Sequence, residues 1–185
     1  MIKLILLVVV GFLAAKFLFN FDPKNLIKPV TQPIIKQAPV SIFNLERYTD
    51  QSLNFAINHP VGWIVAPYSN ELVIASTAEG VRGENRKEQI RIAIKQILLP
   101  EEKTLEEYVN STQVEGVVIK SRKNLTLDGR PAISVIQERV PPVEPAVQII
   151  YLMNGDRFYS ISVTPLDSEL MPVFEQLLVS FKFLS

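Results

Sequence analysis

The sequence predicts an α+β fold, in which an antiparallel β-sheet is flanked by helices and preceded by an N-terminal apolar helix. Three observations support this fold class. Apolar and polar residues alternate in several short segments between residues 53 and 163, as they do in half-buried strands. Asp128-Gly129 and Asn154-Gly155 are dipeptides that tight β-hairpins favour. Apolar residues between Leu170 and Phe181 recur at helical spacing, which predicts a helix packed on the sheet.

The chain begins with an apolar segment that we expect to act as a membrane anchor. Ile2 to Phe19 is 18 residues long and contains two lysines. A spanning helix needs about 20 apolar residues, and a lysine near its end can extend to the headgroups. A cleaved signal peptide is the alternative, with Leu13-Ala14-Ala15 as its cleavage site, whereas a lipoprotein is excluded because the chain has no cysteine to acylate. Residues 1–19 are therefore interpreted as a membrane anchor or signal segment.

Residues 20–45 are predicted to form a proline-rich linker. Proline fixes φ and lacks an amide donor, so this segment is expected to be an extended, semi-rigid spacer. Its prolines are Pro23, Pro29, Pro33 and Pro39. Residues 46–185 would then form the folded domain.

The orientation of the domain is indicated by two opposing signals. Lysines are more numerous after the apolar segment than before it, which by the positive-inside rule favours a cytoplasmic domain. A short basic start followed by an apolar run is, however, typical of an export signal. We expect a single-pass protein of the cell membrane with an extracytoplasmic domain.

The first half of the domain is predicted to contain strands and one capped helix. Leu53, Phe55 and Ile57 alternate with more polar residues, a turn follows at residues 59–62, and Trp63 begins a second run. Further strands are expected at residues 72–75 and 90–95. Thr104 and Glu107 have the spacing of a capping box, which predicts a helix from Thr104 to about Thr112.

The second half is predicted to contain two hairpins and the terminal helix. Residues 125–127 and 132–140 flank Asp128-Gly129, and residues 147–153 and 158–163 flank Asn154-Gly155. Because residues 147–153 are apolar on both faces, except for Gln148, they are expected to form a central strand. Asp167 or Ser168 is the expected cap of the terminal helix.

Composition excludes several classes of function. The absence of cysteine excludes disulfides, thiol catalysis and cysteine-ligated metals. The chain has 19 basic and 19 acidic residues, of which residues 1–45 hold five lysines and one aspartate, so residues 46–185 carry 14 basic and 18 acidic residues. An acidic domain is poorly suited to nucleic acid, whose phosphates must be neutralised. A small basic group, Arg122-Lys123 beside Arg130, is interpreted as an aid to solubility.

The residues that could carry chemistry are few, and we assign no catalytic, cofactor-binding or metal-binding residue and no cofactor. His59 is the only histidine, and its position before Pro60 predicts a hydrogen bond to the turn rather than catalysis. The pairs Glu101-Glu102 and Glu106-Glu107 could attract a cation, but acidic residues are also what the dipole of a helix start favours. The aromatic residues expected in the sheet core are Tyr151, Phe158 and Tyr159.

Three segments of the domain resemble PsbP-like proteins. Residues 53–63 (LNFAINHPVGW) resemble the opening of that domain, although His59 stands where the family pattern has an aromatic residue. Residues 127–132 (LDGRPA) are similar to its mid-domain hairpin, and residues 173–183 (VFEQLLVSFKF) are similar to its terminal helix. The resemblance implies the α/β/α sandwich that PsbP shares with the Ran-binding nuclear import factor. It implies roles in binding and assembly, brings no catalytic residues, and does not imply a photosystem function.

Two hypotheses for function follow. The first is a membrane-tethered, extracytoplasmic and non-enzymatic module that binds or assembles an unknown protein partner. The second is a small-ligand carrier or enzyme with a pocket between the sheet and a helix. A ligand buried beside Trp63 or Tyr151 would favour the second hypothesis.

Overall fold

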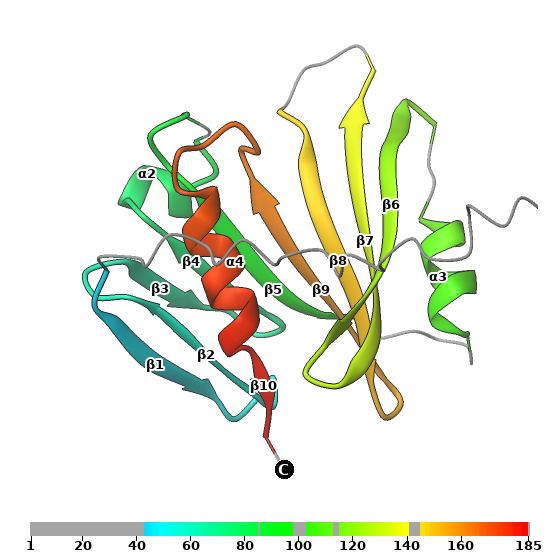
Figure 1. The fold of residues 1–185 in the computed structure, drawn as a ribbon, viewed down its shortest axis with the longest axis horizontal. Coiled ribbons are helices and arrows are strands. Elements are labelled where there is room, and N and C mark those ends of the chain that lie inside the picture. Colours follow the sequence, from blue (N-terminus) through cyan, green and yellow to red (C-terminus); the bar gives the residue numbers. More distant parts are fainter. Residues whose placement is uncertain (1–42, 85, 98–102, 113–114, 141–144, 185) are drawn as a thin grey trace, which may run out of the picture. The chain divides into compact units, whose positions relative to one another are not determined.

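The computed structural model describes residues 43–84, 86–97, 103–112, 115–140 and 145–184. These residues form the strands and helices labelled in Figure 1. The strands are β1 (Leu45–Asp50), β2 (Phe55–Pro60), β3 (Ile64–Pro67), β4 (Glu71–Ala75), β5 (Arg91–Ile97), β6 (Val117–Leu127), β7 (Arg130–Arg139), β8 (Val147–Asn154), β9 (Arg157–Thr164) and β10 (Lys182–Phe183). The helices are α2 (Ala78–Val81), α3 (Leu105–Ser111) and α4 (Met171–Ser180).

The strands form two antiparallel sheets rather than one. In the described part of the chain, the larger sheet has seven strands in the order β3-β4-β5-β9-β8-β7-β6, and the smaller sheet has three in the order β1-β2-β10. The α+β class expected from the sequence is thus confirmed. The smaller sheet combines the first two strands of the domain with a strand from near its C-terminus, a pairing that no local sequence pattern indicates.

The two expected hairpin turns are both present, one of them displaced by a residue. Leu127 pairs with Arg130, so Asp128 and Gly129 are the turn residues, with φ values of 50° and 71°. Such positive φ angles are what a tight hairpin requires. In the next hairpin Asn154 pairs with residue 157, so the turn consists of residues 155 and 156 and not of Asn154-Gly155 as expected.

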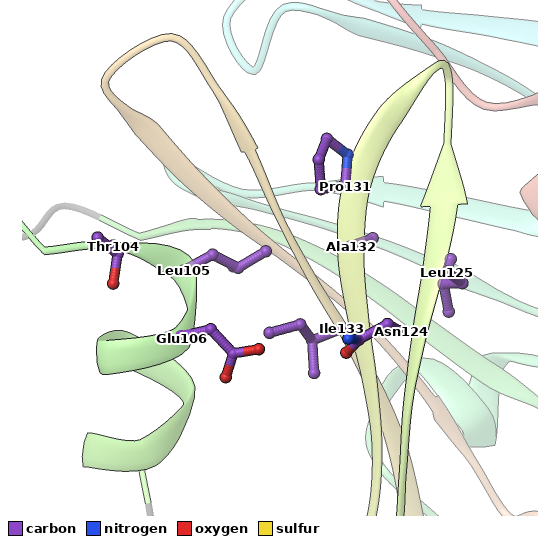
Figure 2. Close-up of a pocket in the computed structure, with 8 residues that line it drawn as sticks. All are labelled: Thr104, Leu105, Glu106, Asn124, Leu125, Pro131, Ala132 and Ile133. Carbon is purple, nitrogen blue, oxygen red and sulfur yellow. The ribbon is translucent and has the colours of Figure 1, made fainter.

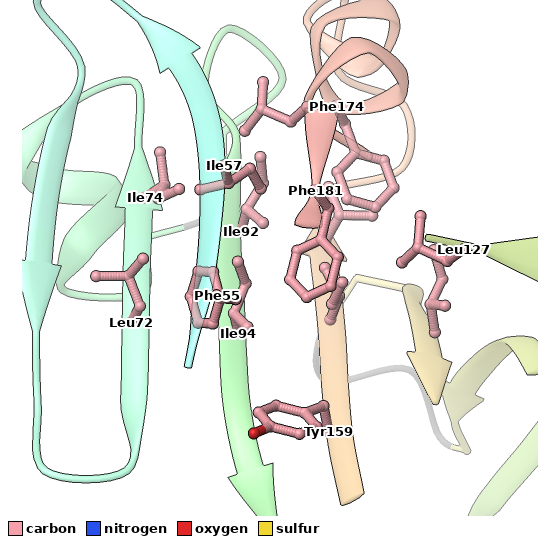
Figure 3. Packing of buried hydrophobic residues seen from close by; sticks show 14 of the residues in the cluster. Phe55, Ile57, Leu72, Ile74, Ile92, Ile94, Leu127, Tyr159, Phe174 and Phe181 are labelled. Carbon is pink, nitrogen blue, oxygen red and sulfur yellow. The ribbon is translucent and has the colours of Figure 1, made fainter. Parts of the chain in front are cut away.

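The main core lies between the larger sheet and a layer formed by the smaller sheet and α4 (Figure 1). Figure 3 shows Ile92 and Ile94 of β5 facing Phe55 of β2, with Phe174 and Phe181 alongside. The rings of Phe55 and Phe181 stack with their centroids 5.3 Å apart. This packing confirms that the terminal helix buries its apolar face against the sheet.

A second, smaller apolar cluster lies on the opposite face of the larger sheet, under α3. Val109 of α3 is fully buried there against Ile133 and Val135 of β7 and Tyr151 of β8. The neighbouring residues of β8, such as Ile150, face the main core. The prediction that residues 147–153 form a central strand covered on both faces is therefore confirmed.

The C-terminal residues are fastened to the β6–β7 turn by four side chains that we call the C-terminal clasp. Asp128 Oδ2 accepts a hydrogen bond from the backbone N–H of Phe183 at 2.9 Å, and Asp128 Oδ1 lies 3.0 Å from Lys182 Nζ. The Arg130 guanidinium lies 5.1 Å from the centroid of the Phe183 ring, as in a cation–π contact. The backbone N–H bond is the main reason why the pKa of Asp128 is lowered.

Two expectations about individual side chains are wrong. Neither Asp167 nor Ser168 caps α4, because Leu170 occupies the N-cap position without a side-chain hydrogen bond. Ser168 Oγ instead accepts a hydrogen bond from Leu170 N at 3.1 Å. The basic residues Arg122, Lys123 and Arg130 do not form one basic group on the surface. Arg122 reaches to α3, whereas Arg130 belongs to the C-terminal clasp.

The expected membrane anchor (1–19), all of the linker before Phe43, and Glu101-Glu102 lie outside the described residues. Among the residues that the structure does describe, no helix is both long enough and apolar enough to cross a membrane.

Candidate binding site

The site begins with α3, whose first turn is fixed by a complete capping box. Thr104 Oγ1 accepts a hydrogen bond from Glu107 N at 3.2 Å, and Glu107 Oε2 accepts one from Thr104 N at 2.8 Å. These two bonds satisfy backbone donors that a helix start otherwise leaves free. The helix predicted from Thr104 and Glu107 is confirmed, and its first turn has a defined position above β7.

A cleft of about 300 Å³ lies between this first turn and the β6–β7 hairpin. We call it the α3 cleft. Figure 2 shows Leu105 and Glu106 projecting from the helix toward Ile133 and Asn124 of the sheet. Its lining residues are Thr104, Leu105, Glu106, Asn124, Leu125, Pro131, Ala132 and Ile133. The cleft therefore combines an apolar floor with a polar rim.

Arg122 of β6 connects the two walls of the α3 cleft. Its Nη1 donates a hydrogen bond to Asn110 Oδ1 at 2.8 Å, and its Nη2 forms an ion pair with Glu106. Both partners lie on α3, at positions four residues apart and so on the same side of the helix. Arg122 thus fixes the helix to the edge strand and neutralises the carboxylate at the rim.

The side chains of Thr104 and Glu107 at the first turn of α3 are engaged with each other. The Thr104 hydroxyl donates to Glu107 Oε2 at 2.8 Å, so its proton is already engaged. The pKa of Glu107 is lowered, chiefly by the backbone N–H of Thr104, which holds this carboxylate ionised as a hydrogen-bond acceptor. A general base for neutral pH needs a pKa raised toward that pH, which is the opposite shift.

Aromatic residues lie beside the floor of the site, on the same face of the larger sheet. The ring of Tyr108 lies 5.7 Å from that of Tyr151 in an edge-to-face arrangement and 5.2 Å from that of Phe158. Burial raises the pKa of both Tyr108 and Tyr151, so each stays a neutral phenol. The expectation that Tyr151, Phe158 and Tyr159 belong to the sheet core is confirmed, since all three are buried.

His59 lies in a different part of the domain, at the end of β2. It is buried, and its Nδ1 donates a hydrogen bond to the carbonyl oxygen of Pro60 at 3.1 Å. Its cross-strand neighbour Glu46 places a carboxylate oxygen 3.7 Å from the same nitrogen. The predicted hydrogen bond to the turn is therefore observed. Trp63 is also remote from the α3 cleft and packs against the main core.

The sequence indicated only one wall of the site. Thr104 was recognised through its capping box with Glu107, and Glu106 as a member of an acidic pair, but neither Asn124 nor Ile133 was assigned to a binding site. The available signal was strand alternation, which places Asn124 on one face of the strand and Leu125 and Leu127 on the other. Which strand face lies beneath α3 depends on tertiary packing. Within the described ranges, no group of histidine and acidic residues is arranged to hold a metal ion.

Comparison with known proteins supports the fold. No protein-family model and no curated protein sequence matches the chain. Among solved structures, cyanobacterial PsbP (CyanoP) from Synechocystis sp. PCC 6803 matches with a TM-score of 0.53 and 16% sequence identity, over 82% of this chain and 99% of that one.

Two other matches have lower scores. A protein of unknown function from Pseudomonas aeruginosa, described as a putative regulator, has a TM-score of 0.47 at 12% identity, over 74% of this chain and 95% of that chain. A Bacteroides thetaiotaomicron VPI-5482 protein has a TM-score of 0.43 at 7% identity, over 76% of this chain and 48% of that chain. The match to cyanobacterial PsbP is the one that bears on architecture, and it shows that this chain has a PsbP-like fold.

Proposed function

We propose that this protein is a membrane-tethered, extracytoplasmic, non-enzymatic module that binds or assembles a protein partner. In this proposal residues 1–19 anchor the chain in the cell membrane, residues 20–45 are the spacer, and the PsbP-like domain presents the α3 cleft. The apolar leader and the proline-rich segment support the tether. The membership of this domain in the PsbP-like family is part of the proposal, because the measured similarity concerns the fold.

The observation that carries the binding role is the construction of the α3 cleft. Leu105 and Pro131 offer apolar surface, while the carboxylate of Glu106 is neutralised by Arg122 and the hydroxyl of Thr104 is engaged by Glu107. Such a lining can receive an aliphatic or aromatic side chain. It keeps the Asn124 amide at the rim for a hydrogen bond with the partner backbone.

The tether is tested by labelling a single installed cysteine. Ser69 is exposed in the turn between β3 and β4, and the chain is otherwise free of cysteine. Intact cells carrying Ser69→Cys would be treated with a membrane-impermeant maleimide. Labelling of a full-length, membrane-bound protein is the expected result. Labelling of a shorter protein released from the membrane would indicate a cleaved leader, and labelling only after lysis would refute the extracytoplasmic location.

The binding role is tested by filling the cleft. Asn124→Trp should block the α3 cleft, because Asn124 is exposed and lines it, whereas Val179→Trp places the same side chain on the outer surface of α4. Crosslinking in the native membrane should trap a protein complex with the wild type and with Val179→Trp. The complex should be reduced with Asn124→Trp. Equal crosslinking by both variants would exclude the cleft as the binding site.

A small-ligand carrier is the second candidate function. The volume of the α3 cleft, about 300 Å³, is at the lower end of the range of ligand pockets. Native mass spectrometry of the protein purified from its own membrane distinguishes the two candidates. A co-purified small molecule that is lost in Asn124→Trp would favour the carrier, whereas a stable protein complex without such a molecule would favour the binding module.

A further inference from the structure

The larger sheet ends in a long edge strand, β6 (Val117–Leu127). This strand is last in the strand order and, among the described residues, pairs with β7 alone. Figure 1 shows it at one end of the sheet. With 11 residues it is about twice as long as an ordinary strand. The outer side of such a strand presents backbone N–H and C=O groups that can pair with another chain.

The register of the β6–β7 hairpin shows which backbone groups of β6 point outward. Leu127 and Arg130 close the two-residue turn as a hydrogen-bonded pair. Hydrogen-bonded and non-hydrogen-bonded pairs then alternate along an antiparallel ladder. By this alternation the N–H and C=O groups of Arg122, Asn124 and Thr126 point away from β7. These groups form the outward-facing side of the edge strand.

The charge of β6 favours an acidic partner over a second copy of this chain. The strand contains Lys120, Arg122 and Lys123 and no acidic residue, although the domain as a whole is acidic. Lys120 and Arg122 each form an ion pair with an acidic residue. Lys123 is exposed, and no acidic side chain of the described residues pairs with it. Two copies of β6 in an antiparallel pair would bring their basic residues together, and like charges on paired strands are destabilising.

We infer that an extended, acidic segment of the protein partner adds to the larger sheet as a strand along β6. This inference rests on the proposed binding function and specifies the form of the partner at the α3 cleft. The regular part of the edge runs from Ser121 to Leu127, because the register shifts between Ile119 and Ser121. This stretch has the length of an ordinary strand. In strand addition, main-chain hydrogen bonds supply affinity and alternate side chains supply specificity.

An added strand would bring its alternate side chains next to the α3 cleft. Arg122 and Asn124 lie on the face of β6 that carries α3, because Arg122 contacts Glu106 and Asn124 lines the cleft (Figure 2). A neighbouring strand lies about 4.8 Å away, so its side chain opposite Asn124 would stand at the rim of the cleft. The next side chain would lie on the other face beside Lys123, where a carboxylate can form a cross-strand ion pair. The partner segment should therefore alternate apolar residues with acidic ones.

Proline substitution tests the backbone contact. Thr126→Pro removes an outward N–H, a change that an edge strand tolerates on its solvent side. Thr49→Pro is the matched control, because Thr49 is exposed on β1, the edge strand of the smaller sheet. Asn58, opposite Arg47, donates its N–H to Ser180 Oγ and not to β1. That pair is thus non-hydrogen-bonded, and by alternation the N–H of Thr49, two residues on, also points outward.

Full-length protein carrying each change would be crosslinked in its native membrane. The yield of the complex should fall about tenfold in Thr126→Pro, which loses a backbone hydrogen bond to the partner, and should be retained in Thr49→Pro. Lys123→Glu should also reduce the complex, whereas Arg47→Glu, the same change of charge on β1, should not. Equal yields from the two proline variants, or from the two glutamate variants, would overturn the strand pairing.

Amide hydrogen exchange tests the inference without any substitution. In the isolated complex the amides of Arg122, Asn124 and Thr126 should exchange more slowly than in the free protein, and the amide of Thr49 should exchange at the same rate. Unchanged exchange on β6 would overturn the strand pairing, even in a folded complex.

The outcomes separate the strand pairing from the proposed function. A complex that is lost in Asn124→Trp but retained in Thr126→Pro would overturn the strand pairing and leave the α3 cleft as the binding site. Failure of the wild type to form any complex would overturn both. Purified protein that crosslinks to a second copy, and no longer does so in Thr126→Pro, would assign the edge to a dimer and overturn the acidic partner.

Discussion

Phe174→Ala tests whether the main core is closed by α4 in the way the structure shows. The side chain of Phe174 is 1% exposed and lies in the cluster that joins α4 to both sheets. Truncation of a buried phenylalanine removes its transfer free energy and leaves a cavity, which together cost about 3–5 kcal/mol. A single domain has a stability of about 5–15 kcal/mol, so the variant should still fold but with a large part of its stability lost.

The assay is urea unfolding of a fragment covering residues 43–185. Unfolding is monitored through the fluorescence emission of Trp63, which packs against the same cluster. We expect one cooperative transition in the unsubstituted fragment. With a slope near 2 kcal/mol per molar urea, a loss of about 4 kcal/mol moves the midpoint by about 2 M. The exposed Val179→Ala should stay within about 0.5 kcal/mol of the parent. A loss below about 1 kcal/mol in Phe174→Ala would show that α4 does not pack through this face.

Three further predictions concern individual hydrogen bonds. Asp128→Ala should destabilise the fragment by about 1–3 kcal/mol, because it leaves the Phe183 N–H without an acceptor, and amide hydrogen exchange at β10 should accelerate; unchanged exchange there would contradict this. Because the pKa of Asp128 is lowered in the folded state, its contribution to the free energy of unfolding is complete above the ordinary pKa of 3.8 and is lost as the pH falls through the lowered pKa. Urea midpoints measured over a pH series, for the parent fragment and for Asp128→Ala, test this pH dependence. Glu107→Ala should accelerate exchange at the first amides of α3 and leave β10 unchanged; protection retained throughout α3 would show that the capping box is dispensable. His59→Ala should lower the urea midpoint but leave crosslinking to the partner intact, and loss of crosslinking at an unchanged midpoint would give the histidine a functional role.

Local signals in the sequence predicted those elements that local interactions form. The Thr104–Glu107 capping box specifies where α3 begins, because both of its hydrogen bonds join residues three apart. Asp128-Gly129 specifies its turn through the φ angles of the two residues themselves. The alternation of isoleucine with other residues from Ile90 to Lys95 predicted β5. The structure agrees, because the isoleucines on one face of this strand are completely buried.

Elements that depend on distant partners were missed. β1 (Leu45–Asp50) has a mostly polar sequence and an exposed surface, and it exists because β2 supplies its hydrogen bonds. β10 has two residues and is specified by the C-terminal clasp. The α3 cleft joins residues 104–106 to residues 124–133, and no pattern within either segment indicates the other.

The assembly of the smaller sheet has a consequence for how the protein is made. β2 lies between β1, which is synthesised first, and β10, which is synthesised last, and the bond from Asn58 N to Ser180 Oγ joins residues 122 apart in the chain. Contacts of such long range slow folding, because the intervening chain must be ordered before they form. A nascent chain on the ribosome therefore cannot close this core until Phe183 has emerged. During synthesis the smaller sheet therefore stays incomplete until its last strand is added.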